Sequence, residues 1–245
     1  FGKRIHHYFK VDSTNAVALR FAHEGEPQGA LIVAEEQTAG RGQAGRGWHS
    51  EKSSGIYFTV LLRPEISPMD APLITLMAGL AVHQAVAEQT GLVPDIRWPN
   101  DVLVGGKKIC GILTEMHAEP GRVHFVLVGV GLNINNTSLP KELERTATSL
   151  RLASGRAVSR IELLAKLLRY LDRDYNRFLK EGAAAILRRF AEISSYAAGR
   201  RVRIANGPQS FTGTTAGLEP NGMLRVARED GRIELVISGR VSDAD

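Results

Sequence analysis

Two short stretches of the sequence place cationic side chains among glycines and polar residues, a pattern typical of anion-binding sites. Residues 34–50 read AEEQTAGRGQAGRGWHS and contain Arg41 and Arg46. Residues 96–115 read IRWPNDVLVGGKKICGILTE and contain Lys108 at the start of an apolar run. Guanidinium and ammonium groups suit carboxylate and phosphate oxygens, so both stretches predict contact with an anionic ligand. A solvated loop and a lysine that reaches solvent stay open as alternatives.

The glycine loop also matches a dinucleotide-binding fingerprint, Gly40-Arg41-Gly42-Gln43-Ala44-Gly45, after an apolar run at 30–34. In dinucleotide-binding folds the third glycine of this fingerprint begins a helix, and the N-terminus of that helix binds the pyrophosphate. Here Arg-Gly-Trp-His-Ser and a further predicted strand follow, and no Lys-Ser or Lys-Thr closes a phosphate loop. The sequence therefore argues against both nucleotide motifs. It favours an arginine loop that closes over an anion, with Trp48 as a flat face for a purine.

Alternating helices and strands are predicted to position these stretches. Helices are expected at 16–22 behind an Asp12-Ser13-Thr14 cap, at about 70–90, and at 159–194. The apolar face of the last comprises Ile161, Leu164, Leu167, Leu168 and Leu171. Strands are expected at 30–36, 56–62 and around 95–98, 107–115 and 122–130. Residues 37–55, rich in Gly, Ser and Arg, predict a mobile loop.

After residue 197 the pattern becomes purely β. Short strands are predicted at 201–204, 211–214, 223–226 and 233–237. The pairs Asn206-Gly207, Asn221-Gly222 and Asp230-Gly231 predict the turns between them, because each suits positive φ. This change predicts two domains, residues 1–197 and 198–245, the second a small barrel.

Composition limits the class of protein. The 245 residues are 43% hydrophobic and 23% charged, enough for a substantial core. The net charge of +5 fits either a basic solvated surface or attraction of anionic partners. A single cysteine, Cys110, excludes an internal disulfide, suits a reducing compartment and predicts a buried structural thiol. The sequence has no uninterrupted apolar run long enough to predict a membrane span, and it shows no signal peptide that would predict export.

Six groups of residues share one order and spacing with a known family. They are Ser13-Thr14-Asn15, Gln37-Thr38-Ala39-Gly40-Arg41-Gly42, Gly45-Arg46-Gly47-Trp48, Trp98-Pro99-Asn100-Asp101, Lys108-Ile109-Cys110-Gly111-Ile112-Leu113 with Glu115, and Gly129-Val130-Gly131-Leu132-Asn133-Ile134. Over residues 5–150 the chain resembles biotin protein ligases, and its β-rich tail resembles their C-terminal barrel. The resemblance implies an α+β fold: a class II aminoacyl-tRNA-synthetase-like catalytic domain, with a mixed β-sheet and flanking helices, plus a small SH3-like β-barrel.

The resemblance also implies a reaction and a set of site residues. ATP would activate biotin to biotinyl-5′-AMP, with Mg²⁺ accompanying the triphosphate, and a lysine of biotin carboxyl carrier protein would then accept the biotinyl group. Lys108 and Arg41 would be the catalytic cations. The implied biotin-binding residues are Ser13, Thr14, Asn15, Gln37, Gly40, Arg41, Gly42, Gln43, Lys108 and Gly111. The implied nucleotide-binding residues are Arg46, Trp48, Asn100, Asp101 and Asn133, and no metal ligands are predicted.

Two positions depart from the family pattern. Gln43 stands where the family's glycine loop commonly has arginine, and a neutral amide predicts looser retention of the adenylate. Arg97 stands where lysine is common, and it is assigned no role. Many relatives carry an N-terminal DNA-binding domain. The sequence as given has no room for one before Ser13, so the expected form is a ligase only, although the absence of an initial Met leaves an upstream segment open.

Two other functions are compatible with parts of the sequence. A lipoate–protein ligase of the same fold is the nearest alternative, and a non-enzymatic nucleic-acid-binding protein, supported only by charge and the barrel, is remote. The expected partner is the carrier protein of a biotin-dependent carboxylase. No nucleic-acid or membrane partner is expected, and the expected location is the cytoplasm. A homodimer through a sheet edge near residues 122–134 is compatible with the family, and the barrel is an equally open contact for the carrier.

Overall fold

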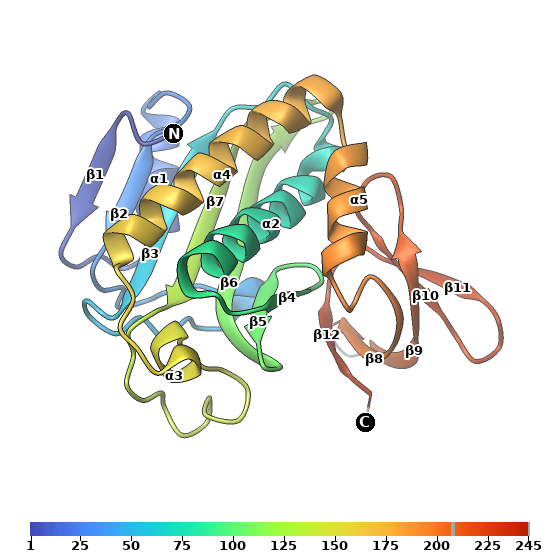
Figure 1. Cartoon of the computed structure of the whole chain (residues 1–245). Helices are drawn as coiled ribbons and strands as arrows, with labels where there is room; N and C mark the ends of the chain where they lie inside the picture. Colours follow the sequence, from blue (N-terminus) through green and yellow to red (C-terminus); the bar gives the residue numbers. More distant parts are fainter. Residues whose placement is uncertain (207–208, 245) are drawn as a thin grey trace.

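Two β-sheets organise the chain (Figure 1), and the computed structural model describes residues 1–206 and 209–244. The larger sheet comprises β1 (Ile5–Tyr8), β2 (Leu31–Ala34), β3 (Gly55–Leu62), β4 (Pro94–Arg97), β5 (Asp101–Val104), β6 (Lys107–Glu119) and β7 (Arg122–Asn133). In space these strands follow the order β1-β2-β3-β7-β6-β5-β4. β1 and β2 run parallel, whereas the other neighbouring strands run antiparallel, so the sheet is mixed.

Helices cover both faces of the larger sheet. α1 (Thr14–His23) packs on one face, against β3 and β7. α2 (Ala71–Thr90), α4 (Arg160–Glu181) and α5 (Ala184–Ile193) form a layer on the other face (Figure 1). A short helix, α3 (Leu150–Ser154), and two 3₁₀ turns, η1 (Gln43–Gly45) and η2 (Pro68–Asp70), lie in the connections. The sheet is thus the middle of three layers.

Strand β3 separates two hydrophobic cores, because all eight of its residues are buried and successive side chains point to opposite faces. Ile56, Phe58, Val60 and Leu62 belong to the main core, which α2 and α4 complete. Leu61 belongs to a smaller core that α1 completes. A strand covered on both faces has an apolar run instead of a strict alternation.

Helix α2 is apolar on nearly all sides because it lies inside the molecule. By length and composition alone, residues Pro68–Thr90 could cross a membrane, but 67% of that apolar window is buried within the protein. The helix ends at Gly91, whose φ of 74° is in the left-handed region that favours glycine. Burial in the core accounts for its composition.

The helix predicted at 159–194 is two helices. The chain turns between α4 and α5 at Gly182, which has a φ of 77°. Ile161 was wrongly placed on the apolar face, since its side chain is 83% exposed. At 3.6 residues per turn it lies about a third of a turn from the buried stripe that Leu163 and Leu171 define.

The sheet edge expected near residues 122–134 is absent over most of that range, and in the part of the chain that the structure describes only residues 122–125 lack a partner strand on the β3 side. Strand β7 is an interior strand, paired with β3 over Val126–Asn133 and with β6 along its length. Strand β5 pairs with β6 only over Lys107–Gly111. Among the described residues, positions 113–119 of β6 therefore have no partner strand on that side, and they form one available edge in addition to the outer strands β1 and β4.

The second sheet is antiparallel and comprises β8 (Ala198–Asn206), β9 (Gln209–Leu218), β10 (Leu224–Ala227), β11 (Ile233–Val236) and β12 (Arg240–Asp243), in the order β11-β10-β9-β8-β12. The turns at Gly222 (φ 85°) and Gly231 (φ 81°) are confirmed, whereas Gly207 lies outside the described residues. Strands β1, β5 and β12 were not predicted, because their four residues show neither a regular alternation of apolar and polar side chains nor a wholly apolar run. The division into domains 1–197 and 198–245 stays a prediction.

Candidate active site

One cavity of about 370 Å³ lies among the predicted motifs, a volume usual for ligand pockets. Every predicted site residue lines it except Gly40. A Cβ at Gly40 would lie 2.6 Å from the carbonyl oxygen of Trp48, so Gly40 packs directly against the backbone of a residue that lines the cavity. Segments that are far apart in the sequence therefore meet in one place.

The start of α1 makes one wall of the cavity polar. Ser13, Thr14 and Asn15 are each only 3% exposed. The Thr14 backbone N–H donates to Gln37 Oε1 at 2.9 Å, and the Thr14 hydroxyl contacts the same oxygen at 3.1 Å. Ser13 occupies the N-cap position, as predicted, but its hydroxyl makes no capping hydrogen bond. This wall offers hydroxyl and amide groups to a ligand that has both donors and acceptors.

The floor of the cavity is bare sheet backbone under an aromatic ring. Gly111 of β6 pairs with Gly131 of β7, and the indole of Trp48 lies over both. A Cβ at Gly131 would come 2.5 Å from Trp48 Nε1, so glycine is needed for this close approach. The Trp48 Nε1–H is buried against this backbone and has no acceptor among the described residues.

Lys108 reaches this floor because of a β-bulge. In a regular strand the side chains of Lys108 and Gly111 would point to opposite faces. Two successive residues of β5 pair with Lys108 and Cys110, so Ile109 is an extra residue in β6. As a result Lys108 Nζ lies 3.0 Å from where a Cβ of Gly111 would be, and 5.3 Å from the centre of the Trp48 ring.

Asp101 fixes the ammonium group of Lys108 at the cavity wall. Lys108 Nζ lies 2.6 Å from Asp101 Oδ1, and Arg97 Nη2 lies 2.7 Å from Asp101 Oδ2. Burial raises the pKa of Asp101, but the charges of Lys108 and Arg97 outweigh that effect, so the pKa lies below its usual value. Arg97, which had no predicted role, is thus the second partner of this carboxylate.

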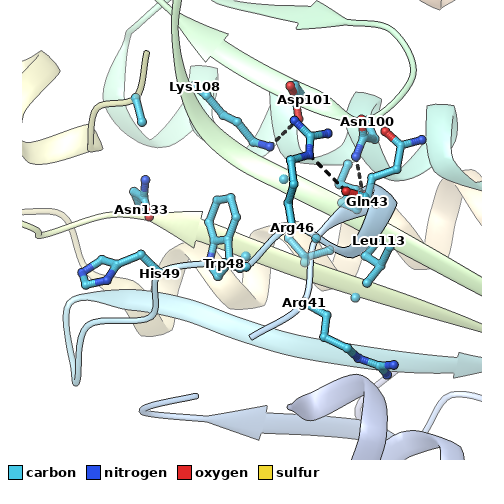
Figure 2. Close-up of a pocket in the computed structure, with 18 of the residues that line it drawn as sticks. Arg41, Gln43, Arg46, Trp48, His49, Asn100, Asp101, Lys108, Leu113 and Asn133 are labelled. Atoms are coloured by element: carbon cyan, nitrogen blue, oxygen red, sulfur yellow. Dashed lines mark hydrogen bonds and ion pairs between the residues drawn. The ribbon is translucent and has the colours of Figure 1, made fainter. Parts of the chain in front are cut away.

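The other predicted cation, Arg41, has a carboxylate partner of its own. Arg41 Nη2 lies 3.2 Å from Glu115 Oε2. Figure 2 shows the guanidinium group pointing away from Lys108. Both residues line the same cavity, but the expected meeting of their charged ends is not present in this structure. The reason is electrostatic, since Asp101 holds one cation and Glu115 holds the other.

The glycine loop folds back on itself and opens no helix. The Gly42 N–H donates to the Arg46 carbonyl at 2.7 Å, and the Trp48 N–H donates to the Gly40 carbonyl at 2.8 Å. The 3₁₀ turn η1 has only three residues and is followed by extended chain. This confirms that the match to the dinucleotide fingerprint is accidental, because the fingerprint requires a helix N-terminus at this point.

The side-chain oxygen atoms of the two predicted asparagines accept no hydrogen bond from the part of the chain that the structure describes. Asn100 Nδ2 donates to the Ile112 carbonyl at 2.8 Å, and Asn133 Nδ2 donates to the Thr148 carbonyl at 3.2 Å. Both amide groups are therefore oriented by backbone acceptors. Cys110 is buried, as predicted, and burial raises the pKa of its thiol. Among the described residues no cluster of three His, Cys, Asp or Glu side chains could hold a metal ion.

Three further side chains at the site were missed. Thr59 is fully buried and contacts Asn15 Oδ1 at 2.5 Å through its hydroxyl. Ser50 accepts a hydrogen bond from Gln37 Nε2 at 3.1 Å. Arg240 of β12 lines the cavity from the second sheet. A single threonine in an apolar strand could have indicated Thr59, whereas no local pattern points to Arg240.

Comparison with known sequences decides the family of this chain. The sequence model of the biotin/lipoate A/B protein ligase family matches residues 8–133, half of the chain. The chain belongs to this family. It is 38% identical to the bifunctional ligase/repressor BirA of Bacillus spizizenii over 236 residues, which are 94% of this chain and 71% of that protein. It is 36% identical to the biotin–[acetyl-CoA-carboxylase] ligase of Mycobacterium tuberculosis over 236 residues, 94% of this chain and 82% of that protein.

The fold of this ligase-family chain is likewise that of a solved biotin protein ligase. The biotin protein ligase from Aquifex aeolicus, solved in complex with biotin and ATP, superposes with a TM-score of 0.83 and is 31% identical in sequence. The match covers 98% of each chain. The mixed sheet with flanking helices and the added antiparallel sheet are therefore the α+β fold of biotin protein ligases.

Proposed function

We propose that this protein is a biotin protein ligase, which uses ATP to form biotinyl-5′-AMP and then biotinylates a lysine of a biotin carboxyl carrier protein. The observation that carries the proposal is the cavity itself. A polar wall, a lysine fixed by a carboxylate and an aromatic ring over bare backbone come together in it. The named ligase relatives and the neighbouring structure with biotin and ATP support the same conclusion.

In the first step a carboxylate oxygen of biotin attacks the α-phosphorus of ATP. The bond from that phosphorus to the bridging oxygen breaks, and pyrophosphate leaves. Two anions must approach each other, so cations are needed where they meet. Lys108 supplies one from a fixed position beside Asp101. Arg41 supplies a second when it turns from Glu115 to the ligand, which its 44% exposure permits.

In the second step the amine nitrogen of the carrier lysine attacks the acyl carbon. The bond between that carbon and the phosphate oxygen breaks, AMP leaves, and the nitrogen loses a proton. Negative charge develops on the acyl oxygen, and the ammonium group of Lys108 stabilises it by position. Mg²⁺ enters as the counter-ion of the triphosphate and is thus part of the nucleotide substrate.

Two subsites follow from the side chains of the cavity. The ureido ring of biotin has both N–H donors and a C=O acceptor, so it suits the wall of Ser13, Thr14, Asn15 and Gln37. The adenine ring suits the face of Trp48. The rest of the proposed nucleotide subsite consists of Arg46, Asn100, Asp101 and Asn133. Gly40, Gly42 and Gln43 of the glycine loop shape the proposed biotin subsite, with Gly111 in the floor.

Exchange of radiolabelled pyrophosphate into ATP tests this function directly. We expect exchange that depends on biotin and is not supported by lipoate. Exchange with lipoate in place of biotin would assign the protein to the lipoate branch of the family. Calorimetric titration with biotin, alone and then with ATP, measures the two subsites separately.

The partners and the cellular location are part of this proposal. The acceptor is the carrier protein of a biotin-dependent carboxylase, and the protein works in the cytoplasm, where a reduced Cys110 is stable. A homodimer can form by pairing of the available β6 edge, residues 113–119, with its copy. Light scattering after size-exclusion chromatography tests the dimer. We infer neither a nucleic-acid nor a membrane partner.

The finer fold labels also belong to the proposal. We assign the larger sheet and its helices to the class II aminoacyl-tRNA-synthetase-like group, and the second sheet to the SH3-like barrels. Five antiparallel strands, with tight turns at Gly222 and Gly231, support the barrel label. A hydrogen bond from Trp98 Nε1 to the Gly222 carbonyl at 2.9 Å joins the second sheet to the turn after β4.

A further inference from the structure

Glu115, a residue of β6 without an assigned role, contacts two parts of the proposed biotin subsite through one oxygen atom. Its Oε2 accepts a hydrogen bond from Asn15 Nδ2 at 2.6 Å and another from Arg41 Nη2 at 3.2 Å. Asn15 belongs to the start of α1 and Arg41 to the glycine loop. We propose that Glu115 is a positioning residue, which sets the direction of the hydrogen bonds in the biotin subsite and tethers the loop to it. This inference rests on the proposed function.

The direction of the hydrogen bonds follows from the chemistry of a carboxylate, which only accepts. Asn15 must turn its NH₂ group to Glu115, so its oxygen faces the Thr59 hydroxyl, which donates to it at 2.5 Å. Thr59 has one hydroxyl hydrogen, so its oxygen can only accept in its 2.9 Å contact with Thr14 Oγ1. The Thr14 hydrogen then points to Thr59 or to Gln37 Oε1. The lone pairs of Thr14 remain as an acceptor for a ligand N–H.

Close packing prevents this chain of hydrogen bonds from reversing. Thr59 is fully buried and Asn15 is nearly so. A Cβ at Gly129 would overlap the Asn15 amide group, so the amide lies directly on the backbone of β7. Neither group can rotate without losing a partner, and a buried group without a partner is strongly disfavoured. Asn15 Nδ2 also lies 3.4 Å from the Leu113 carbonyl, which likewise only accepts. Glu115, the nearer and charged acceptor, therefore acts together with this carbonyl to make the subsite present an acceptor to the ureido N–H.

The two contacts of Glu115 differ in strength. The Arg41 and Glu115 side chains are 44% and 36% exposed, and an ion pair of that kind contributes little to stability. The loop can consequently leave this contact when a ligand arrives. The bond to Asn15 is shorter, sheltered and charge-assisted. Removal of the charge should act mainly on biotin binding through Asn15.

The first test compares the biotin affinity of Glu115→Gln with that of the unmodified protein, by calorimetry. Glutamine keeps the shape and one acceptor oxygen but lacks the charge, so we expect the Kd for biotin to rise about five- to tenfold. Glu119→Gln is the matched control, because Glu119 lies on the same strand but contacts His124 outside the cavity. Its biotin affinity should equal that of the unmodified protein, and thermal unfolding should show both variants folded.

The second test asks whether Glu115 acts through Thr59. Thr59→Val removes the hydroxyl at nearly constant shape, and in that background Glu115→Gln should change the Kd by less than about twofold. Thr59→Ser restores the hydroxyl and should restore the full effect of Glu115→Gln. Additive effects, or an unchanged Kd in Glu115→Gln alone, would overturn this inference and leave the proposed function intact. Failure of the unmodified protein to bind biotin would overturn the proposed function.

Discussion

Replacement of Lys108 by alanine removes the cation on which the proposed chemistry depends most. The ammonium group lies 2.6 Å from Asp101 and 5.3 Å from the centre of the Trp48 ring, at the wall of the cavity. Lys107, its neighbour in the sequence, points elsewhere and donates to the Glu144 carbonyl at 2.8 Å. Lys107→Ala is therefore a control with the same change of charge on the same strand.

The structure sets the size of both effects of Lys108→Ala. Loss of one electrostatic contact to the reacting groups should slow adenylate formation by about 100- to 1000-fold. The variant also loses a charge-assisted hydrogen bond to Asp101, which contributes about 1.5–3 kcal/mol to stability. Arg97 remains as a partner of that carboxylate, so the loss should fall at the lower end of this range. Lys107→Ala should change stability by less than about 0.5 kcal/mol.

The loss of stability should depend on pH in a defined direction. In the folded protein the pKa of Asp101 lies below its ordinary value of 3.8, so its stabilisation is present above that value and is lost as the pH falls through the folded value. The variant raises this pKa toward 3.8 because one of its two cations is gone. The stability difference should therefore be constant from about pH 5 upward and should shrink below about pH 4.

Biotin-dependent pyrophosphate exchange measures the chemical effect, and urea denaturation at several pH values measures the stability. Exchange by Lys108→Ala within about threefold of the unmodified enzyme, with the variant folded, would refute the assignment of Lys108 as the cation at the reacting centre. Equal losses in Lys107→Ala and Lys108→Ala would refute it as well, because they would reflect net charge alone.

Three other changes test separate parts of the site. Gly131→Ala places a Cβ 2.5 Å from Trp48 Nε1, so the ring must move. The KM for ATP should then rise at least about tenfold, while calorimetry should show that biotin still binds. In the control Gly79→Ala the nearest contact of the new Cβ would be 3.5 Å, so the KM for ATP and the binding of biotin should be unchanged. Gln43→Arg adds a charge beside the adenylate and should reduce escape of the adenylate by about tenfold. Biotinylation of a bystander protein measures this escape. Equal biotinylation of the bystander by Gln43→Arg and by the unmodified protein would contradict the idea of looser retention. Arg240→Gln removes the cation that the second sheet contributes and should raise the KM for ATP about fivefold with the biotin Kd unchanged, as initial rates would show.

Much of the fold was evident from the sequence because it depends on local patterns. The run of apolar residues and the glycine that follows it define α2 and its end at Gly91. The Asn221-Gly222 turn follows in the same way from the φ angles that glycine permits. The motif residues around Arg41 and Lys108 were also identifiable, because their types and spacing limit the chemistry that they can support.

Local patterns failed where the strands meet. The period of an apolar run indicates a strand but does not name its neighbours, so β7 could not be recognised as an interior strand. Ile161 was misplaced because several leucines in α4 fit more than one helical face, and only packing against α2 and the sheet selects one of them. The four-residue strands β1 and β5 are defined by their pairing partners and have no period of their own.

The sequence by itself indicated most of the side chains that line the cavity, since their types fix the possible charges and hydrogen bonds, but it did not indicate Arg240. Only the tertiary structure decided how they face one another. The bulge at Ile109 turns Lys108 to the cavity, Glu115 holds the charged end of Arg41 away from Lys108, and Arg240 comes from another sheet. Each of these depends on the register or the packing of segments far apart in the chain, and such long-range pairings are chosen by the energy of the whole fold rather than by any local run of residues.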